Sequence, residues 1–157
     1  MNASLLRRAV PGIAVVAFCA LAIFLAVNHV DRLGFPANES STVGSLRSIY
    51  SANAAFVKAH PQGGYAKKLS DLSSRSESSG SAEPQPEWTI DSTLATGTKS
   101  GYRFNYVPHT VGLGKTEAYE LIANPIGREK HHFFMDETGV IRASETGPAT
   151  ISSKPLQ

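Results

Sequence analysis

Adjacent histidines and an acidic turn are the residues of this chain with the clearest chemical potential. His131 and His132 form the only histidine pair, and Asp136, Glu137 and Thr138 follow shortly after it. Neighbouring residues of a strand point to opposite faces, so the two imidazoles are poorly placed to share one metal ion. A Ca²⁺ ion requires about six oxygen ligands, whereas Asp-Glu-Thr-Gly is typical of a hairpin turn. We therefore predict no metal site and no cofactor.

A second chemical candidate is the sequence Gly-Leu-Gly-Lys-Thr at residues 112–116, which is similar to the end of a phosphate-binding loop. That motif requires a glycine at position 109, where this chain has His109, and a helix where we expect a strand. A hairpin turn explains the glycines better. A periplasmic hydrolase is the remaining enzymatic alternative, but no nucleophile, base and orienting group can be named for it. We expect neither catalysis nor a small-molecule substrate.

The overall composition narrows the class of partner. Of the 157 residues, 18% are charged and the formal net charge is +2, which is too little to indicate nucleic-acid binding. The only cysteine, Cys19, lies in an apolar run, so an intrachain disulfide and a cysteine-based metal site are both excluded. The chain must therefore be held together by packing.

That apolar run extends without a charge from Ala9 to Val27, about 19 residues, close to the length that a helix needs to span a bilayer. Arg7 and Arg8 precede it, so the positive-inside rule predicts that residues 1–8 stay in the cytoplasm. We predict a single transmembrane helix over residues 9–30, with the head of the chain on the other side of the membrane.

A cleaved signal peptide is the alternative interpretation of this run, although apolar residues continue past the small residues that would mark a cleavage site. If the run is retained, its small side chains allow neighbouring helices to approach closely. The residues expected to mediate this lateral packing are Ala14, Ala17, Ala20 and Ala22.

A second, amphipathic helix is predicted from Asn38 to His60. Asn38 is a suitable N-cap, and Pro61 stops the helix after His60. Apolar residues recur at helical spacing and define a stripe that should pack against a sheet. The stripe comprises Val43, Leu46, Ile49, Tyr50, Ala54, Phe56 and Val57. Asn53 lies within it and would need a hydrogen-bond partner if buried.

The remainder of the chain predicts a loop followed by an antiparallel sheet. Residues 73–87 are rich in Ser, Glu and Pro, so we expect a mobile loop within a head that spans residues 36–149, before a polar tail over 150–157. Alternating aromatic and β-branched residues predict about four strands, over 102–107, 119–123, 131–135 and 140–143. The expected fold class is α+β: a transmembrane helix and an amphipathic helix packed on a roughly four-stranded antiparallel sheet.

Longer stretches of the chain resemble bacterial type IV pilin-like proteins and pseudopilins. ANESSTVGSLRSIYSANAAF at 37–56 is similar to the part of the family's long N-terminal helix that follows the membrane. IDSTLATGTKSGYRFNY at 90–106 and HHFFMDETGVIRASETGPA at 131–149 resemble the C-terminal sheet of the same group. The resemblance implies a pilin-like fold, a filament whose core is bundled N-terminal helices, and a role in assembly, adhesion, motility or secretion. The implied location is a bacterial inner membrane with a periplasmic or extracellular head, and the implied partners are the membrane and other pilin-like subunits.

Two positions near the N-terminus depart from the family pattern. The family has a Gly at the prepilin peptidase site and a Glu five residues into the mature chain, and the matching positions here are Leu5 and Val10. The resemblance implies a structural or accessory subunit of a type IV pilus or type II secretion-like assembly. The departures favour an alternative, a pilin-derived binding or sensing head that stays tethered in the membrane and forms no filament.

Overall fold

The computed structural model describes residues 37–73, 86, 88–112 and 114–156. The predicted transmembrane helix over 9–30 and most of the predicted loop over 73–87 lie outside the described residues. Asn38–Gln157 form one compact unit.

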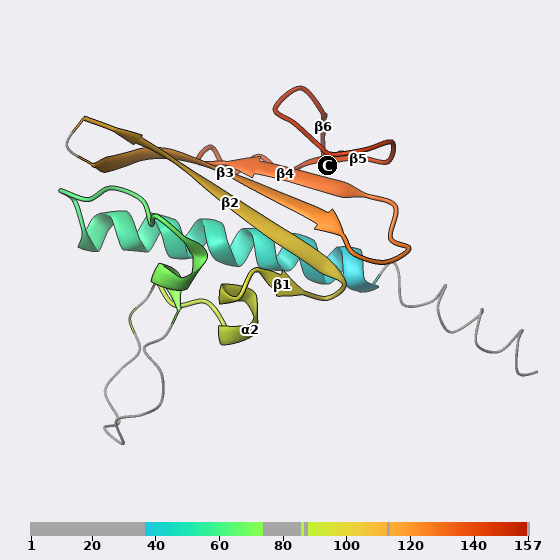
Figure 1. The fold of residues 1–157 in the computed structure, drawn as a ribbon, viewed down its shortest axis with the longest axis horizontal. Coiled ribbons are helices and arrows are strands. Elements are labelled where there is room, and N and C mark those ends of the chain that lie inside the picture. Colours follow the sequence, from blue (N-terminus) through green and yellow to red (C-terminus); the bar gives the residue numbers. More distant parts are fainter. Residues whose placement is uncertain (1–36, 74–85, 87, 113, 157) are drawn as a thin grey trace, which may run out of the picture. The chain divides into compact units, whose positions relative to one another are not determined.

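The longest element is a helix over residues 37–59, which lies along one face of a sheet (Figure 1). Its last turn is closed where His60 N donates to Phe56 O at 2.9 Å. The His60 ring stacks on Phe56 at a centroid distance of 4.1 Å and meets Trp88 edge-on at 5.2 Å. The helix thus ends where the His60-Pro61 pair predicts, because the residue before a proline disfavours helical backbone.

The buried face of this helix is centred on Leu46 and Ile49, neither of which has exposed surface. Its other buried members are Thr42, Ser45, Ala52 and Asn53. The hydroxyls of Thr42 and Ser45 donate to backbone oxygens one turn back, at 2.8 and 3.0 Å, so their burial leaves no hydroxyl unpaired. The buried face of the helix is therefore not the same as the predicted apolar stripe. It includes the small side chains of Thr42, Ser45 and Ala52, which let the sheet approach closely.

The helix packs on a six-stranded antiparallel sheet whose strands follow one another in chain order. The strands are β1 (Thr98–Lys99), β2 (Tyr102–Val111), β3 (Lys115–Pro125), β4 (His132–Asp136), β5 (Arg142–Ser144) and β6 (Lys154–Pro155). Before the sheet come a 3-10 helix, η1 (Leu69–Leu72), and a one-turn helix, α2 (Ser92–Ala95). Asp91 caps α2 by accepting from Leu94 N at 2.9 Å, and Lys99 Nζ lies 2.7 Å from its second oxygen.

The predicted fold class is wrong in its sheet, which has six strands rather than about four. Within the described residues no helix is long and apolar enough to span a membrane, and the predicted membrane helix lies outside those residues. β1 forms because Ser100 and Gly101 both have positive φ, 51° and 77°, and this two-residue turn pairs Lys99 with Tyr102. β6 forms because the tail folds back along β5. Each added strand is two residues long, too short for an alternating pattern.

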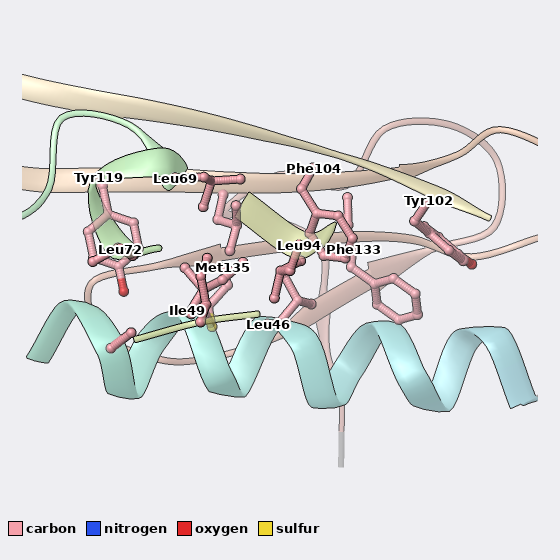
Figure 2. Packing of buried hydrophobic residues seen from close by; sticks show 14 of the residues in the cluster. Leu46, Ile49, Leu69, Leu72, Leu94, Tyr102, Phe104, Tyr119, Phe133 and Met135 are labelled. Carbon is pink, nitrogen blue, oxygen red and sulfur yellow. The ribbon is translucent and has the colours of Figure 1, made fainter. Parts of the chain in front are cut away.

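The core lies between the helix and one face of the sheet (Figure 2). Tyr102 and Phe104 of β2 point into it, whereas Arg103 between them is exposed, which is the period-two alternation of a half-buried strand. Phe133 and Met135 of β4 also belong to the core, but Phe134 between them is buried too, so β4 does not alternate. Leu69, Leu72 and Leu94, from η1 and α2, complete the core.

The beginning of β3 is paired by a loop rather than by β4, which pairs only with Glu120–Ala123. Tyr65 N donates to Thr116 O at 2.9 Å, and Thr116 N donates to Gly63 O at 3.0 Å. Gly64 has a φ of 76°, and a Cβ added to it would overlap the Thr116 carbonyl oxygen. The segment after the helix therefore covers a sheet edge that would otherwise be open.

Candidate functional site

A polar junction joins the first described turn of the long helix to the β3–β4 loop, residues 126–131. Glu39 Oε1 accepts from the backbone N–H groups of Lys130 and His131, both at 3.4 Å, and Glu39 Oε2 lies 2.8 Å from His131 Nδ1. Tyr102 Oη donates to His131 O at 2.9 Å, which holds the same loop from β2. One carboxylate thus connects the helix to backbone and side chain of a loop about 90 residues away in the sequence.

His131 lies between two carboxylates that come from distant parts of the chain. Its Nδ1 faces Glu39, and its Nε2 lies 3.2 Å from Oε1 of Glu145, just after β5. The Glu39 side chain is 22% exposed and that of Glu145 is 64% exposed. A protonated ring donates to both acids, whereas a neutral ring donates to one. Because Glu39 is the nearer and more buried acceptor, we expect Nδ1–H to Glu39 to be the bond kept by the neutral ring.

Two further contacts hold the same part of the helix. Asn38 Nδ2 donates to Glu129 Oε1 at 3.0 Å, and the hydroxyl oxygens of Ser41 and Ser100 lie 2.8 Å apart. The predicted N-cap role of Asn38 is wrong, because residue 37 is already helical and the amide reaches across to the loop instead. Asn38, Glu39 and Ser41 therefore attach the helix start to the sheet at separate points.

Beside His131, this end of the sheet is hollowed. A cavity of about 270 Å³ is lined by His131, Ala143, Ser144, Glu145, Lys154, Pro155 and Leu156. It combines apolar walls with one ammonium, one carboxylate and one imidazole. Its volume lies just below the usual range of small-ligand pockets, roughly 300–1,000 Å³.

The two imidazoles and Asp136 are each paired with polar groups. Both ring nitrogens of His131 face carboxylates, so in this geometry neither faces the hydroxyl or thiol of a nucleophile–base pair. His132 Nδ1 is paired with Asn124 Oδ1 at 2.8 Å. Asp136 accepts from the backbone and the hydroxyl of Thr138 in its turn. Within the described part of the chain, no group of three or more His, Cys, Asp and Glu side chains could hold a metal ion.

A second polar cluster lies deeper in the core, around Asn53. This residue has no exposed surface, and its Nδ2 donates to Ile49 O at 3.3 Å. Its Oδ1 accepts from Ala66 N at 3.3 Å and lies 3.1 Å from Tyr106 Oη. Burial raises the pKa of Tyr106 and that of Tyr119, whose hydroxyl is buried with no hydrogen-bond partner among the described residues. The cluster supplies the partners that a buried asparagine requires, so its role is structural.

The predicted packing residues of the helix lie at different depths. Leu46 and Ile49 are in the core, Val43 and Phe56 pack against its margin, and Ala54 and Val57 are half-buried. Tyr50 is 37% exposed, and its ring lies against Gly139 of the β4–β5 turn. The predicted membrane and topology residues lie outside the described residues: Arg7, Arg8, Ala14, Ala17, Ala20 and Ala22.

Sequence reasoning missed the junction because its members carry no shared pattern. In the sequence, Glu39 lies at the start of the predicted helix and Glu145 follows the last predicted strand, and nothing pairs either with His131. Glu145 meets His131 because β4 and β5 are neighbours with His132 opposite Ser144, whereas Glu39 reaches His131 from the helix that packs on the sheet. Only this register could have indicated the site.

Comparisons with known proteins found no match to this chain among family models, curated proteins or solved structures. The junction and the cavity are therefore interpreted from their own geometry.

Proposed function

We propose that this protein is a structural or accessory subunit of a membrane-anchored assembly of the type IV pilus or type II secretion kind. The uncharged run from Ala9 to Val27 and the resemblance at residues 37–56 support this proposal. The observation that carries it is the attachment of the helix start to the sheet through Asn38, Glu39 and Ser41. The proposed location is a bacterial inner membrane, with residues 1–8 in the cytoplasm and the head on the opposite side.

A subunit that is held by its N-terminal segment must pass force from that segment into its head. Force from residues 1–36 enters the described unit at residue 37, one residue before the junction. Hydrogen bonds to charged groups contribute about 1.5–3 kcal/mol each, and those of Glu39 act in a partly buried setting. Load is therefore shared with the sheet at the first turn, before it reaches the apolar contacts of Leu46 and Ile49.

The test uses the full chain in its own host membrane, with Glu39→Ala as the variant and Glu117→Ala as its control. Glu117 is an exposed residue of β3 whose carboxylate lies 3.5 Å from Lys115 and contacts nothing at the junction. We expect sheared or cross-linked multimers to contain the wild-type chain and the control. Glu39→Ala should lower their yield several-fold while near-ultraviolet circular dichroism shows a folded head.

A wild-type chain that is found only as a monomer, with an untrimmed N-terminus, would contradict assembly. It would support the second candidate, a permanently tethered binding or sensing head. The cavity beside His131 favours that candidate, since Lys154 and Glu145 offer opposite charges at its rim. The intact mass of the native chain shows directly whether its N-terminus is trimmed. This measurement is informative because Leu5 and Val10 occupy the positions where the pilin-like pattern has the Gly used for processing and the Glu used for docking.

A further inference from the structure

We propose that the cavity beside His131 binds a single α-amino acid with an apolar side chain, with its ammonium group at Glu145 and its carboxylate at Lys154. All the lining residues belong to the compact unit Asn38–Gln157. The inference does not depend on assembly, because the cavity would be present in a subunit that multimerises and in a tethered binding head alike.

The cavity is built on one face of the last two strands of the sheet. Ala143 of β5 is paired with Lys154 of β6, and directly opposite residues of an antiparallel pair project from the same face. Residues two positions along each strand share that face, which adds Glu145 and Leu156. Leu156 N donates to Ile141 O at 2.8 Å, so the pairing continues to that point. The register thus puts Leu156 at one end of the cavity, Lys154 in the middle and Glu145 at the other end.

The acidic end of the cavity is held in place by the polar junction. Glu145 Oε1 lies 3.2 Å from His131 Nε2, and His131 Nδ1 lies 2.8 Å from Glu39 Oε2. With both acids ionised, these three side chains keep a negative charge whether the imidazole is neutral or protonated. An ammonium group is therefore the ligand group that this end of the cavity attracts.

Lys154 supplies the complementary charge. It is exposed, and its ammonium has no ion-pair or hydrogen-bond partner within the described residues, Glu145 included. The register makes Lys154 and Glu145 diagonal neighbours, a relation that separates two residues by about 7–8 Å. Opposite charges that line one cavity without neutralising each other favour a ligand that carries both charges, which is the chemistry of a zwitterion.

The volume and the apolar wall define the rest of the ligand. A volume of about 270 Å³ equals that of about nine water molecules at roughly 30 Å³ each, which leaves room for one amino acid but not for a longer peptide. Ala143, Pro155 and Leu156 form the apolar part of the wall, and Leu156 is 43% exposed. An apolar ligand side chain that covers Leu156 removes both groups from water, which favours binding.

The experiment titrates L-leucine into the full chain in detergent micelles, with isotope-labelled alanine and leucine methyl groups observed by NMR. We expect saturable shifts of the Ala143 and Leu156 methyl resonances at millimolar L-leucine, the affinity expected of a few partly exposed contacts. The methyl resonances of Ala66 and Leu72, which have no exposed surface and lie outside the cavity wall, should not move. N-acetyl-leucine lacks the ammonium and leucinamide lacks the carboxylate, so each should bind about fivefold more weakly.

Two neutralising variants identify which residue binds which group of the ligand. Glu145→Gln should abolish the preference for leucine over N-acetyl-leucine and keep the preference over leucinamide, and Lys154→Gln should do the reverse. Glu117→Gln and Lys115→Gln are the matched controls, because these side chains are 53% and 51% exposed on β3 and lie outside the cavity wall. Neither control should change either preference. A purely structural role of Glu145 or Lys154 would weaken binding of all three compounds alike.

Each outcome decides a separate point. The absence of saturable shifts with L-leucine overturns the proposed site, and equal binding of the three compounds overturns the assignment of the two charges. Shear-released or cross-linked multimers of the same chain report on assembly independently. A chain that forms multimers but does not bind leucine refutes this inference alone. A chain that binds leucine but is found only as an untrimmed monomer refutes the assembly role alone.

Discussion

Replacing Asn53 with alanine should lower the free energy of unfolding of the head by about 2–4 kcal/mol. The substitution removes an amide from a fully buried position on the helix face that packs against the sheet. Ala66 N then loses the acceptor it has at 3.3 Å. The change also leaves a small cavity, because alanine cannot fill the space of the carboxamide.

The magnitude follows from which groups are left without a partner. A buried N–H without an acceptor costs about 1–3 kcal/mol, and the missing side-chain atoms add about 1 kcal/mol. Tyr106 Oη is affected less, because its single proton can be donated to Ala66 O at 2.9 Å as well as to Asn53 Oδ1 at 3.1 Å. The expected loss is therefore a large fraction of the roughly 5–15 kcal/mol that stabilises a typical domain.

The assay is urea unfolding of the full chain, followed by near-ultraviolet circular dichroism, which reports the packed tyrosines of the head. Ser51→Ala is the control, since Ser51 is exposed on the same helix and its replacement should change stability by less than about 0.5 kcal/mol. Tyr106→Phe and the double variant Asn53→Ala/Tyr106→Phe complete a cycle. Their effects should be non-additive by about 0.5 kcal/mol or more, because Tyr106 Oη donates to Asn53 Oδ1, the same oxygen that accepts from Ala66 N.

Two results would refute this reasoning. If Asn53→Ala unfolds at the same urea concentration as Ser51→Ala, the buried amide is not what holds the helix to the segment after it. If the effects of Asn53→Ala and Tyr106→Phe simply add, the two side chains do not form one hydrogen-bonded cluster.

Three further predictions concern local backbone geometry and the two ends of the pH range. Gly64→Ala should lower the free energy of unfolding in urea by more than about 2 kcal/mol, because φ is 76° and the new Cβ would overlap a carbonyl oxygen. Gly44→Ala, on the open face of the helix, should be neutral or stabilising, and equal effects of the two changes would contradict the close approach at Gly64. Burial raises the pKa of Asp91, but hydrogen bonds from a lysine and from backbone N–H groups outweigh it and lower that pKa. Its stabilisation should hold above about pH 4 and be lost as the pH falls through the lowered pKa, and Asp91→Ala should flatten this acid limb of a stability–pH curve. Burial raises the pKa of Tyr102 and of Tyr119, so above about pH 10 only the unfolded chain loses their protons. The free energy of unfolding should then fall by about 1.4 kcal/mol per pH unit for each, and phenolate absorbance should show both ionising only on unfolding.

Local signals in the sequence were sufficient for the helix end and one turn. The helix ends next to His60-Pro61, and the predicted hairpin turn at residues 136–139 is confirmed by a φ of 77° at Gly139 and its donation to Asp136 O at 3.0 Å. Both features are decided within about four residues by backbone sterics and hydrogen bonding.

The buried face of the helix could be predicted only in part. Leu46 and Ile49 were recognisable from apolar spacing, but Thr42 and Ser45 were not, because their burial depends on hydroxyls that satisfy themselves one turn back. Asn53 shows the same limit. The sequence indicated that it needed a partner, and only the fold decided that Ala66 and Tyr106 supply one.

The sequence by itself determined where an uncharged run, a helix end and a tight turn must lie, since each depends on the physical properties of adjacent residues. Tertiary structure alone decided the two short outer strands and the junction at His131. Glu39 and His131 are 92 positions apart, and Glu145 is a further 14. The contact among these residues cannot be predicted from their local sequence. It depends on the order and register of the strands and on the packing of the helix against the sheet.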